Sequence, residues 1–285
     1  MAISLRALLL LVLILGVLLG WRVNKARDQR RAVGAIYDYG GFVYYDWEFV
    51  NRRYTSGRQP PGPGWLRGWL GDEYFQDVTV VSLSDNLFRL KTRPTLDSVL
   101  THAKTMGRLE YLDLRGNQLT DAHLARIRDL TTLESLWIQA SGGLTDNGVA
   151  QLKIMTNITS LHLENATITG RGLDHLAEIP KLEELHVPGN RFIDADLASL
   201  SRMPHLKRLD VGGRSSEITD EGMKLIGNIT TLEFVGIQDT NTSDAGLNRL
   251  RSLPNLKELR TGRSKITPEG IQRFQADRPG VKIVP

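Results

Sequence analysis

Residues 109–130 read LEYLDLRGNQLTDAHLARIRDL, and this stretch combines two hydrophobic periods in one unit. In its first half Leu112 and Leu114 alternate with polar residues, which predicts a short strand with one buried face. In its second half Leu124 and Ile127 recur at a near-helical interval, which predicts a helix. One such unit cannot bury its own apolar faces, so we expect it to stack against similar units.

Copies of this unit occur along most of the chain. They begin at Val78, Leu109, Leu133, Ile158, Leu182, Leu206, Leu232 and Leu256. From Leu109 onward, successive starts lie 24, 25, 24, 24, 26 and 24 residues apart. The pattern L-x-x-L-x-L-x-x-N-x-L and this period resemble those of the leucine-rich repeat family. The resemblance covers residues 78–285 and implies an α/β solenoid, with parallel strands on a concave face and helices on a convex face.

The turn from strand to helix is the most regular part of each repeat. It reads LTDAHL from residue 119, LTDNGV from 144, ITGRGL from 168, ITDEGM from 218 and ITPEGI from 266. We expect the threonine or the aspartate, such as Thr120 or Asp121, to cap the first amides of its own helix. The turn asparagine of the family is present at Asn86, Asn117 and Asn190 but is replaced elsewhere, which leaves the local curvature open.

The composition of the chain excludes several kinds of site. Its 285 residues include no cysteine, so it has no disulfide framework, thiolate zinc site or cysteine nucleophile. The net charge of +4 belongs to the N-terminus, because the first 31 residues carry six basic side chains and one acidic side chain. The remainder therefore carries a net charge of −1, and nucleic acid is not expected as a partner.

The N-terminus contains a candidate membrane anchor. Residues 7–21 read ALLLLVLILGVLLGW, without charge. With residues 2–5 added and Arg6 reaching outward, the stretch approaches the roughly 20 residues that cross a bilayer. Trp21 and Arg22 suit the far interface, and the basic residues that follow favour a cytoplasmic body. A cleaved signal peptide and a buried core helix are the alternatives, and the sequence does not decide whether the segment is removed.

The chain is expected to have three parts. They are an anchor at residues 1–22, a juxtamembrane region with a small α+β cap at residues 23–76, and a solenoid at residues 77–285. Residues 22–38 predict a polar helix that ends at two glycines, and residues 42–49 predict a strand or hairpin. Residues 65–75, WLRGWLGDEYF, predict a short amphipathic helix whose aromatic rings cover the open end of the first repeat. An aromatic ligand pocket is the alternative for this helix.

Alternate strand residues are expected to form columns on the concave face, because neighbouring strands lie about 4.8 Å apart. The middle column reads Ser82, Asp113, Trp137, His162, His186, Asp210, Gly236 and Arg260. The column before it reads Val80, Tyr111, Ser135, Ser160, Glu184, Arg208, Phe234 and Glu258. We expect the aromatic residues Tyr111, Trp137 and Phe234 to face solvent beside charged residues, as in a protein-binding surface. The predicted partner-binding residues are Tyr111, Asp113, Trp137, His162, His186, Arg208, Asp210, Phe234 and Arg260.

Three neighbours in the middle column, His162, His186 and Asp210, offer a second kind of site. Two imidazoles and a carboxylate can ligate zinc or another divalent ion. The plainer interpretation is a solvated polar strip with a histidine–aspartate hydrogen bond. A hydrolase triad of Ser160, His186 and Asp210 would also need an oxyanion hole and a pocket, which a flat sheet does not provide.

The sequence therefore predicts a non-enzymatic protein that is anchored in a membrane by one span and binds another protein through its concave face. It resembles bacterial single-pass membrane-anchored leucine-rich repeat proteins, in which a short basic stretch and a strand region with two glycines precede the repeats. No cofactor, nucleic acid or small-molecule substrate is expected. The alternatives are the metal site, in a sensory or hydrolytic role, and a passive structural component of the envelope.

Overall fold

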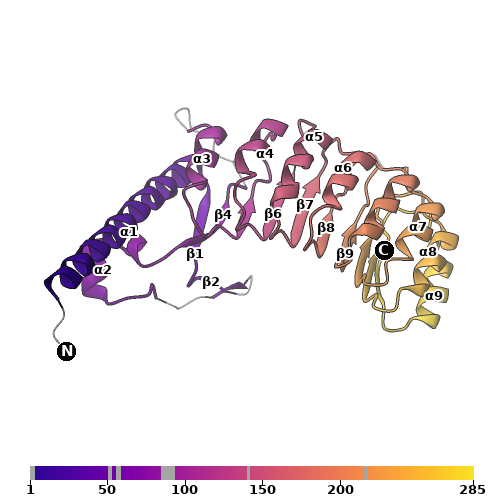
Figure 1. Ribbon diagram of the computed structural model, residues 1–285. Coiled ribbons are helices and arrows are strands. Elements are labelled where there is room, and N and C mark those ends of the chain that lie inside the picture. Colours follow the sequence, from indigo (N-terminus) through magenta and orange to yellow (C-terminus); the bar gives the residue numbers. More distant parts are fainter. Residues whose placement is uncertain (1–3, 51–52, 56–58, 85–93, 140–141, 215–216) are drawn as a thin grey trace. The chain divides into compact units, whose positions relative to one another are not determined.

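The structure is a computed structural model that describes residues 4–50, 53–55, 59–84, 94–139, 142–214 and 217–285 (Figure 1). The chain forms two compact units, Met1–Glu110 and Tyr111–Pro285. The first contains α1 (Leu5–Tyr39), β1 (Phe42–Tyr45), β2 (Phe49–Val50), β3 (Arg53–Tyr54), α2 (Gly64–Leu70), the 3₁₀ helix η1 (Asp72–Tyr74), β4 (Val78–Ser82) and α3 (Leu96–Ala103). The second contains β5 (Tyr111–Asp113), α4 (Asp121–Ile127), β6 (Ser135–Gln139), α5 (Asp146–Val149), η2 (Ala150–Ile154), β7 (Ser160–Glu164), α6 (Gly170–Leu176), β8 (Glu184–His186), η3 (Asp194–Arg202), β9 (Arg208–Asp210), α7 (Asp220–Ile226), β10 (Phe234–Gly236), α8 (Asp244–Arg249), η4 (Leu250–Ser252), β11 (Glu258–Arg260), α9 (Pro268–Asp277) and β12 (Lys282–Val284).

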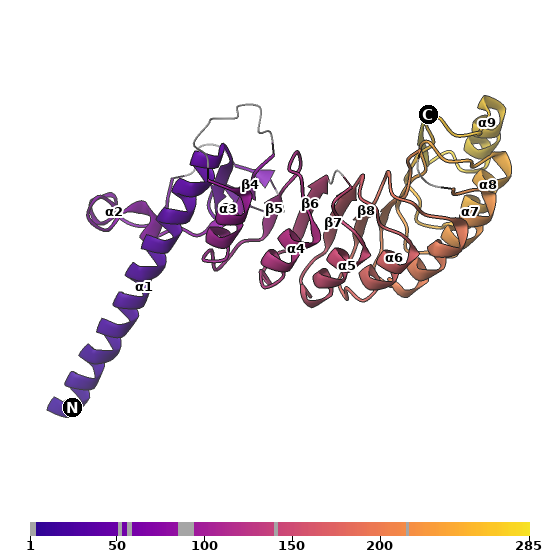
Figure 2. The same ribbon diagram turned by 90° about the horizontal axis from the view of Figure 1, so that it is seen from above.

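The second unit is a solenoid of parallel strands. β5 to β12 follow one another across the sheet in chain order, and each pairs in parallel with the next. The strands line one side of the solenoid and the helices line the other (Figure 2). This is the α/β architecture that the repeats predict, with strands on the concave face and helices on the convex face.

The fixed leucines of the repeats form the core between strands and helices. The second residue of each strand from β5 to β11 is fully buried: Leu112, Leu136, Leu161, Leu185, Leu209, Val235 and Leu259. Burial of one such side chain contributes about 1.5–3 kcal/mol. The contribution depends on the neighbouring repeats, because each repeat covers the next one's apolar edge.

An aspartate in most of the turns links one repeat to the next. Its carboxylate accepts hydrogen bonds from both the backbone amide and the hydroxyl of the residue that precedes the following helix. The donor–acceptor distances lie between 2.6 and 2.9 Å in the pairs Asp121–Thr145, Asp146–Thr169, Asp194–Thr219, Asp220–Ser243 and Asp244–Thr267. The prediction that these threonines cap their own helices is confirmed at Thr145, Thr219 and Thr267. The aspartates have an additional role between repeats.

The glycine of the turn makes room for that aspartate. A Cβ atom at Gly270 would overlap the carboxylate of Asp244, and one at Gly222 would lie 2.5 Å from Oδ1 of Asp194. Gly148, Gly172 and Gly246 stand in the same relation to Asp121, Asp146 and Asp220. Real Cβ atoms do not approach other atoms this closely, so the threonine–aspartate–glycine turn recurs because its three residues fit the adjacent copies.

The turn asparagines satisfy buried backbone groups. Asn190 is fully buried, and its Nδ2 donates to the carbonyls of Leu163 and Val187, each at 2.8 Å. Its Oδ1 accepts from the amide of Ile168 at 3.3 Å. In the repeat that carries Thr240 instead, the hydroxyl donates to the Ile237 carbonyl at 2.8 Å. Asn86, the first predicted turn asparagine, lies outside the described residues.

α1 forms the N-terminal part of the first unit. It is continuous from the apolar segment into the polar one and ends at Gly40, whose φ of 93° belongs to the left-handed region. Among the described residues it is the one helix long and apolar enough to cross a membrane, with a mean hydropathy of 2.2 and 0% burial in its apolar window. Burial begins in its second half, at Gln29, Ala32, Val33 and Ile36.

The second half of α1 and β1 cover the first repeat, and this corrects a prediction. β1 pairs antiparallel with β4, and α3 packs against α1. The amide of Gln29 donates to the Gln76 carbonyl at 2.9 Å and fixes α1 beside the start of β4. The prediction that α2 covers this repeat is wrong, because none of its residues is buried, and Trp65 and Trp69 are 76% and 84% exposed.

Candidate functional site

A ladder of stacked rings runs along the concave face of the solenoid. The ring of His162 stacks between those of Trp137 and His186, with both centroid distances at 4.2 Å. Tyr111 lies 5.7 Å from Trp137, and Phe234 lies 5.8 Å from His186. The strand register causes this arrangement, because it sets Trp137, His162 and His186 directly opposite one another on β6, β7 and β8.

Three arginines lie over the aromatic rings of the ladder. The guanidinium carbon of Arg115 is 4.5 Å from the Trp137 centroid, and those of Arg208 and Arg260 are 4.3 and 5.0 Å from the Phe234 centroid. Each guanidinium also pairs with a carboxylate: Arg115 with Asp113 at 2.7 Å, Arg208 with Glu184 at 3.0 Å and Arg260 with Glu258 at 3.1 Å. These contacts fix the arginine side chains. The side chains are nevertheless 40%, 43% and 44% exposed, so a partner can contact them.

The structure places some predicted contact residues below the surface. Tyr111 and Trp137 are half-buried, but Phe234 is 0% exposed, so the prediction that its ring faces solvent is wrong. Arg208 and Arg260 cover that ring from two neighbouring strands. Asp113, His162 and Asp210 are also buried. These three side chains contact and position neighbouring residues of the face. The side chains of this face that solvent can reach are the three arginines, Tyr111, Trp137 and His186.

Glu184 is the centre of the polar contacts on this face. Its carboxylate accepts hydrogen bonds from Ser160 Oγ at 3.0 Å, His186 Nε2 at 2.9 Å and Arg208 Nε at 3.0 Å. These donors, His186 first, lower the pKa of Glu184 to about 2. Burial, reinforced by His186, lowers the pKa of His162 to about 4, so its imidazole is neutral at pH 7.

Comparison with known proteins agrees with this architecture. A family profile described as "Leucine Rich repeat" matches residues 109–122. The chain therefore has a leucine-rich repeat fold. Similar solved structures include an internalin, inlF, from Listeria monocytogenes, with 22% identity over 67% of this chain and a TM-score of 0.50. They also include internalin C2 (inlC2) from the same organism, with 20% identity over 69% of this chain, 77% of its own length and a TM-score of 0.48.

The similarity to the internalins concerns the fold and only part of their length. The chain spans 57% of the length of the inlF chain, and at 22% identity the similarity shows the fold alone. No curated protein matches the chain.

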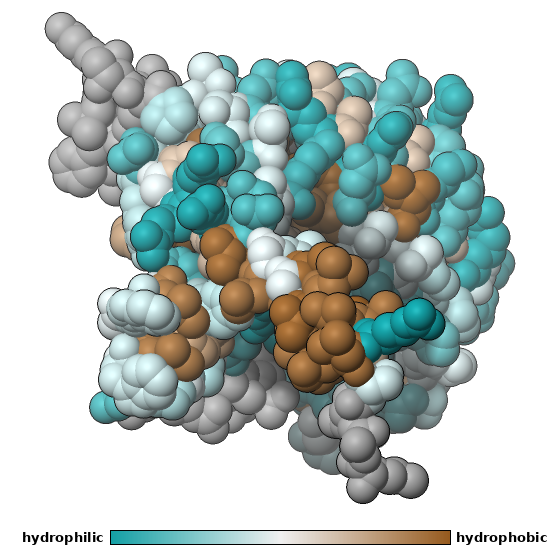
Figure 3. Space-filling model, turned by 60° about the vertical axis from the view of Figure 1, so that its left-hand side comes forward, coloured by the Kyte–Doolittle hydropathy of each residue, from teal (hydrophilic) through white to brown (hydrophobic). Residues whose placement is uncertain are grey.

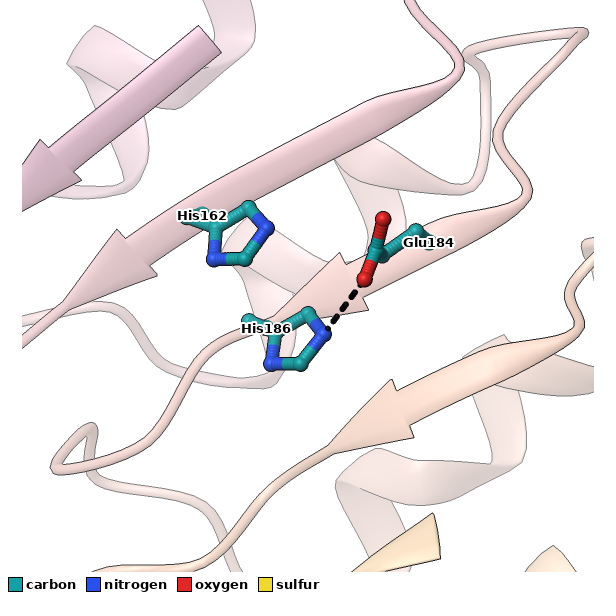
Figure 4. A group of neighbouring side chains, drawn as sticks. All are labelled: His162, Glu184 and His186. Carbon is teal, nitrogen blue, oxygen red and sulfur yellow. Dashed lines mark hydrogen bonds and ion pairs between the residues drawn. The ribbon is translucent and has the colours of Figure 1, made fainter. Parts of the chain in front are cut away.

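His162, Glu184 and His186 form a group with the composition of a metal site (Figure 4). Their candidate ligand atoms all lie within 4.8 Å of one another. Within the part of the chain that the structure describes, the buried Nε2 of His162 has no hydrogen-bond partner.

The group differs from the predicted set in one member, because Glu184 takes the place of Asp210. A carboxylate oxygen of Asp210 accepts from the amide of Gly212 at 3.1 Å, and its other oxygen lies 3.9 Å from His186 Nδ1.

The residues of the hypothetical hydrolase triad do not form its hydrogen bonds. The hydroxyl of Ser160 donates to Glu184, and Nε2 of His186 bonds the same carboxylate. A triad requires the histidine to accept the serine proton, and here Glu184 takes both partners.

Two residues of this surface were absent from the predicted set. Glu184 belongs to the column before the middle one, in which only Tyr111, Arg208 and Phe234 are predicted to bind a partner. Arg115 follows Asp113 by two positions and so belongs to a third column on the same face, which strand alternation would have identified.

Proposed function

We propose that this leucine-rich repeat protein is a non-enzymatic, membrane-anchored binding protein that holds a protein partner on its concave face. One observation carries the proposal: Arg115, Arg208 and Arg260 are each fixed by a ring and a carboxylate, yet remain about two-fifths exposed. Arginine and large aromatic residues are enriched among the residues that dominate binding energy. Because these side chains are already ordered, a partner would lose little side-chain entropy in binding them.

The anchoring part of the proposal rests on α1. Its apolar residues are exposed, whereas its second half is built into the first unit through Gln29, Ala32 and Ile36. A single continuous helix that leaves a folded unit and becomes fully apolar is typical of an anchor. A signal peptide is not expected to be continuous with a helix of the mature fold. The basic residues after Trp21 favour a cytoplasmic location for the repeats.

Proximity labelling in cells of the native source would test partner and sidedness together. A labelling enzyme is fused to the C-terminus, with chemistry that works on one side of the membrane. The wild type is compared with Arg260→Glu and with Arg171→Glu, an equal charge change at an exposed position in α6 on the helical side. We expect a small set of cytoplasmic neighbours that is lost in Arg260→Glu and kept in Arg171→Glu. Labelling of bulk envelope components alone, equal in all three, would favour a passive structural role.

A divalent metal at His162, Glu184 and His186 is a second candidate function. It is favoured by the buried, unpartnered Nε2 of His162 and by the low pKa values of His162 and Glu184, which leave the imidazole neutral and the carboxylate ionised at pH 7. The two imidazoles stack with an interplanar angle of 3°. A metal must lie near the plane of each ring, so binding would have to turn one ring out of the stack.

Zinc titration of the full chain, prepared without a histidine tag, tests this candidate. Metal bound to the folded protein raises its melting temperature. We expect a rise that disappears in His162→Phe, which keeps a ring in the stack, and persists in Asp210→Asn. No rise, or an equal rise in His162→Phe, would exclude the site.

A further inference from the structure

Helix α2 displays two tryptophans that no described residue of the first unit covers. Trp65 and Trp69 lie four residues apart, on one side of the helix, and are 76% and 84% exposed. Two large rings exposed side by side mark a contact surface, because a monomer gains nothing by leaving them in water. Tryptophan in particular prefers the boundary between water and lipid, where its ring is apolar and its indole N–H can meet a polar group.

Contacts between α1 and η1, the 3₁₀ helix that follows α2, hold this segment in place. Arg30 of α1 forms two hydrogen bonds with the Glu73 carboxylate, at 3.1 and 2.8 Å. A hollow between the two elements is lined by Arg30, Arg67 and Glu73 together with backbone of the glycines around them. Gly71, with φ of 91°, makes the sharp exit from α2, and a side chain there would overlap the Arg30 guanidinium. α2 is therefore a fixed part of the first unit.

The same segment reaches the end of the apolar part of α1. Tyr74, four residues after α2, shares a hollow with Leu15, Leu18 and Trp21, and the guanidinium of Arg22 lies 5.8 Å from its ring centroid. Figure 3 looks onto the side from which the apolar part of α1 projects, where apolar side chains gather. Tyr74 thus lies beside the stretch of α1 in which the hydrophobic segment gives way to the basic one, and α2 lies beside Arg30 in the basic part.

We infer that α2 is a second membrane contact, whose tryptophans enter the headgroup region of the bilayer that α1 crosses. The inference rests on the proposed anchoring by α1. A seven-residue helix with two tryptophans is too short to bind a bilayer firmly by itself, but the anchor holds it at the surface, so a weak contact is sufficient. Arg22, which lies over the Tyr74 ring, and the exposed Arg27 supply positive charge on the adjoining part of α1, which fits anionic phospholipids.

Fluorescent labels at single introduced cysteines test this position, since the chain has no cysteine of its own. The full chain is reconstituted into vesicles of phosphatidylcholine and phosphatidylglycerol. An environment-sensitive dye is placed in α2 by Trp69→Cys or by Gly68→Cys, which keeps both tryptophans. Gly16→Cys reports on the proposed span and Gly34→Cys on the polar half of α1, and at all three glycines the added side chain meets open space. Nitroxide lipids and aqueous iodide serve as quenchers.

We expect the α2 labels to emit at shorter wavelength than the Gly34→Cys label, to be quenched by shallow nitroxide lipids, and to lose part of their quenching by iodide. These effects should weaken in vesicles of phosphatidylcholine alone. If the Gly16→Cys label is quenched by lipid while both α2 labels behave like the Gly34→Cys label, the anchor stands and the second contact is refuted. If the Gly16→Cys label is not quenched by lipid, the anchoring proposal itself fails.

Discussion

The carboxylate of Asp244 accepts hydrogen bonds from the backbone amide and from the hydroxyl of Thr267, both at 2.8 Å. The two residues belong to consecutive repeats, so the start of one helix is fixed by the repeat before it. Gly270 completes the arrangement, because any larger residue would overlap the Asp244 carboxylate. The turn that recurs along the chain is thus the joint between repeats, and it makes the stability of each repeat depend on its neighbour.

Substitution at Gly270 should destabilise the C-terminal repeats through Asp244. We expect Gly270→Ala to cost about 1–3 kcal/mol, the usual range for overpacking. Asp244→Ala should cost a similar amount through its lost hydrogen bonds. The double variant should lose less than the sum, because removing the carboxylate also removes the overlap. Urea unfolding measures the cycle, with Gly34→Ala as a control that should cost nothing, because an added methyl group there meets open space and alanine favours the helix. Strict additivity would contradict the proposed joint.

Removing the side chain of Asn190 should be among the most costly polar substitutions in the chain. Asn190→Ala leaves the carbonyls of Leu163 and Val187 and the amide of Ile168 without their side-chain partner inside the fold. We expect a loss of about 2–4 kcal/mol in the free energy of unfolding, since several buried groups are affected together. Asn248→Ala, at an exposed position in α8, should change it by less than about 0.5 kcal/mol. Equal effects would show that water replaces the asparagine.

The hydrophobic periods predicted the solenoid well because burial in each repeat is decided by its own leucines. The strands were identified from one feature alone, the alternation of leucines such as Leu112, Leu136 and Leu161 with polar residues. The role of Asp244 could not be found in the same way, because its partner lies in the next repeat. A capping residue and a residue that bridges two repeats look alike within one turn.

The functional surface was harder to predict than the core. Strand alternation correctly set Trp137 and His162 on one face, but it could not show that Arg208 and Arg260 cover Phe234. Burial on a concave face depends on whether the long side chains of that face cover their neighbours. The aromatic content of α2 was likewise visible in the sequence, whereas the exposure of Trp65 and Trp69 was not, because it depends on what packs against α2 in the folded first unit.

The buried imidazole of His162 should make the solenoid sensitive to mild acid. Its folded-state pKa of about 4 lies below the usual 6.5, so as pH falls the unfolded chain takes up the proton first. Stability is therefore lost as pH falls from about 6.5 to about 4. Glu184, with its pKa lowered from 4.5 to about 2, contributes stability that is kept above pH 4.5 and lost below it.

His162→Phe separates these contributions. It keeps a ring between Trp137 and His186 but removes the titrating group. Between pH 7 and pH 5 we expect the wild type to lose about 1–2 kcal/mol more unfolding free energy than His162→Phe. His205→Gln, at an exposed position, should lose as much as the wild type. If His162→Phe keeps the full acid sensitivity, the imidazole is not held neutral by its surroundings.

The affinity of the partner identified by labelling tests the concave face most directly. Titration of that partner against the wild type, Trp137→Ala, Arg260→Glu and the helical-side control Arg171→Glu gives four dissociation constants. We predict that Trp137→Ala and Arg260→Glu each weaken binding at least about tenfold, or about 1.4 kcal/mol, while the control binds as the wild type does. Circular dichroism melting must show that all four chains remain folded. Unchanged affinity in both concave-face variants would contradict the proposal and place the binding surface elsewhere.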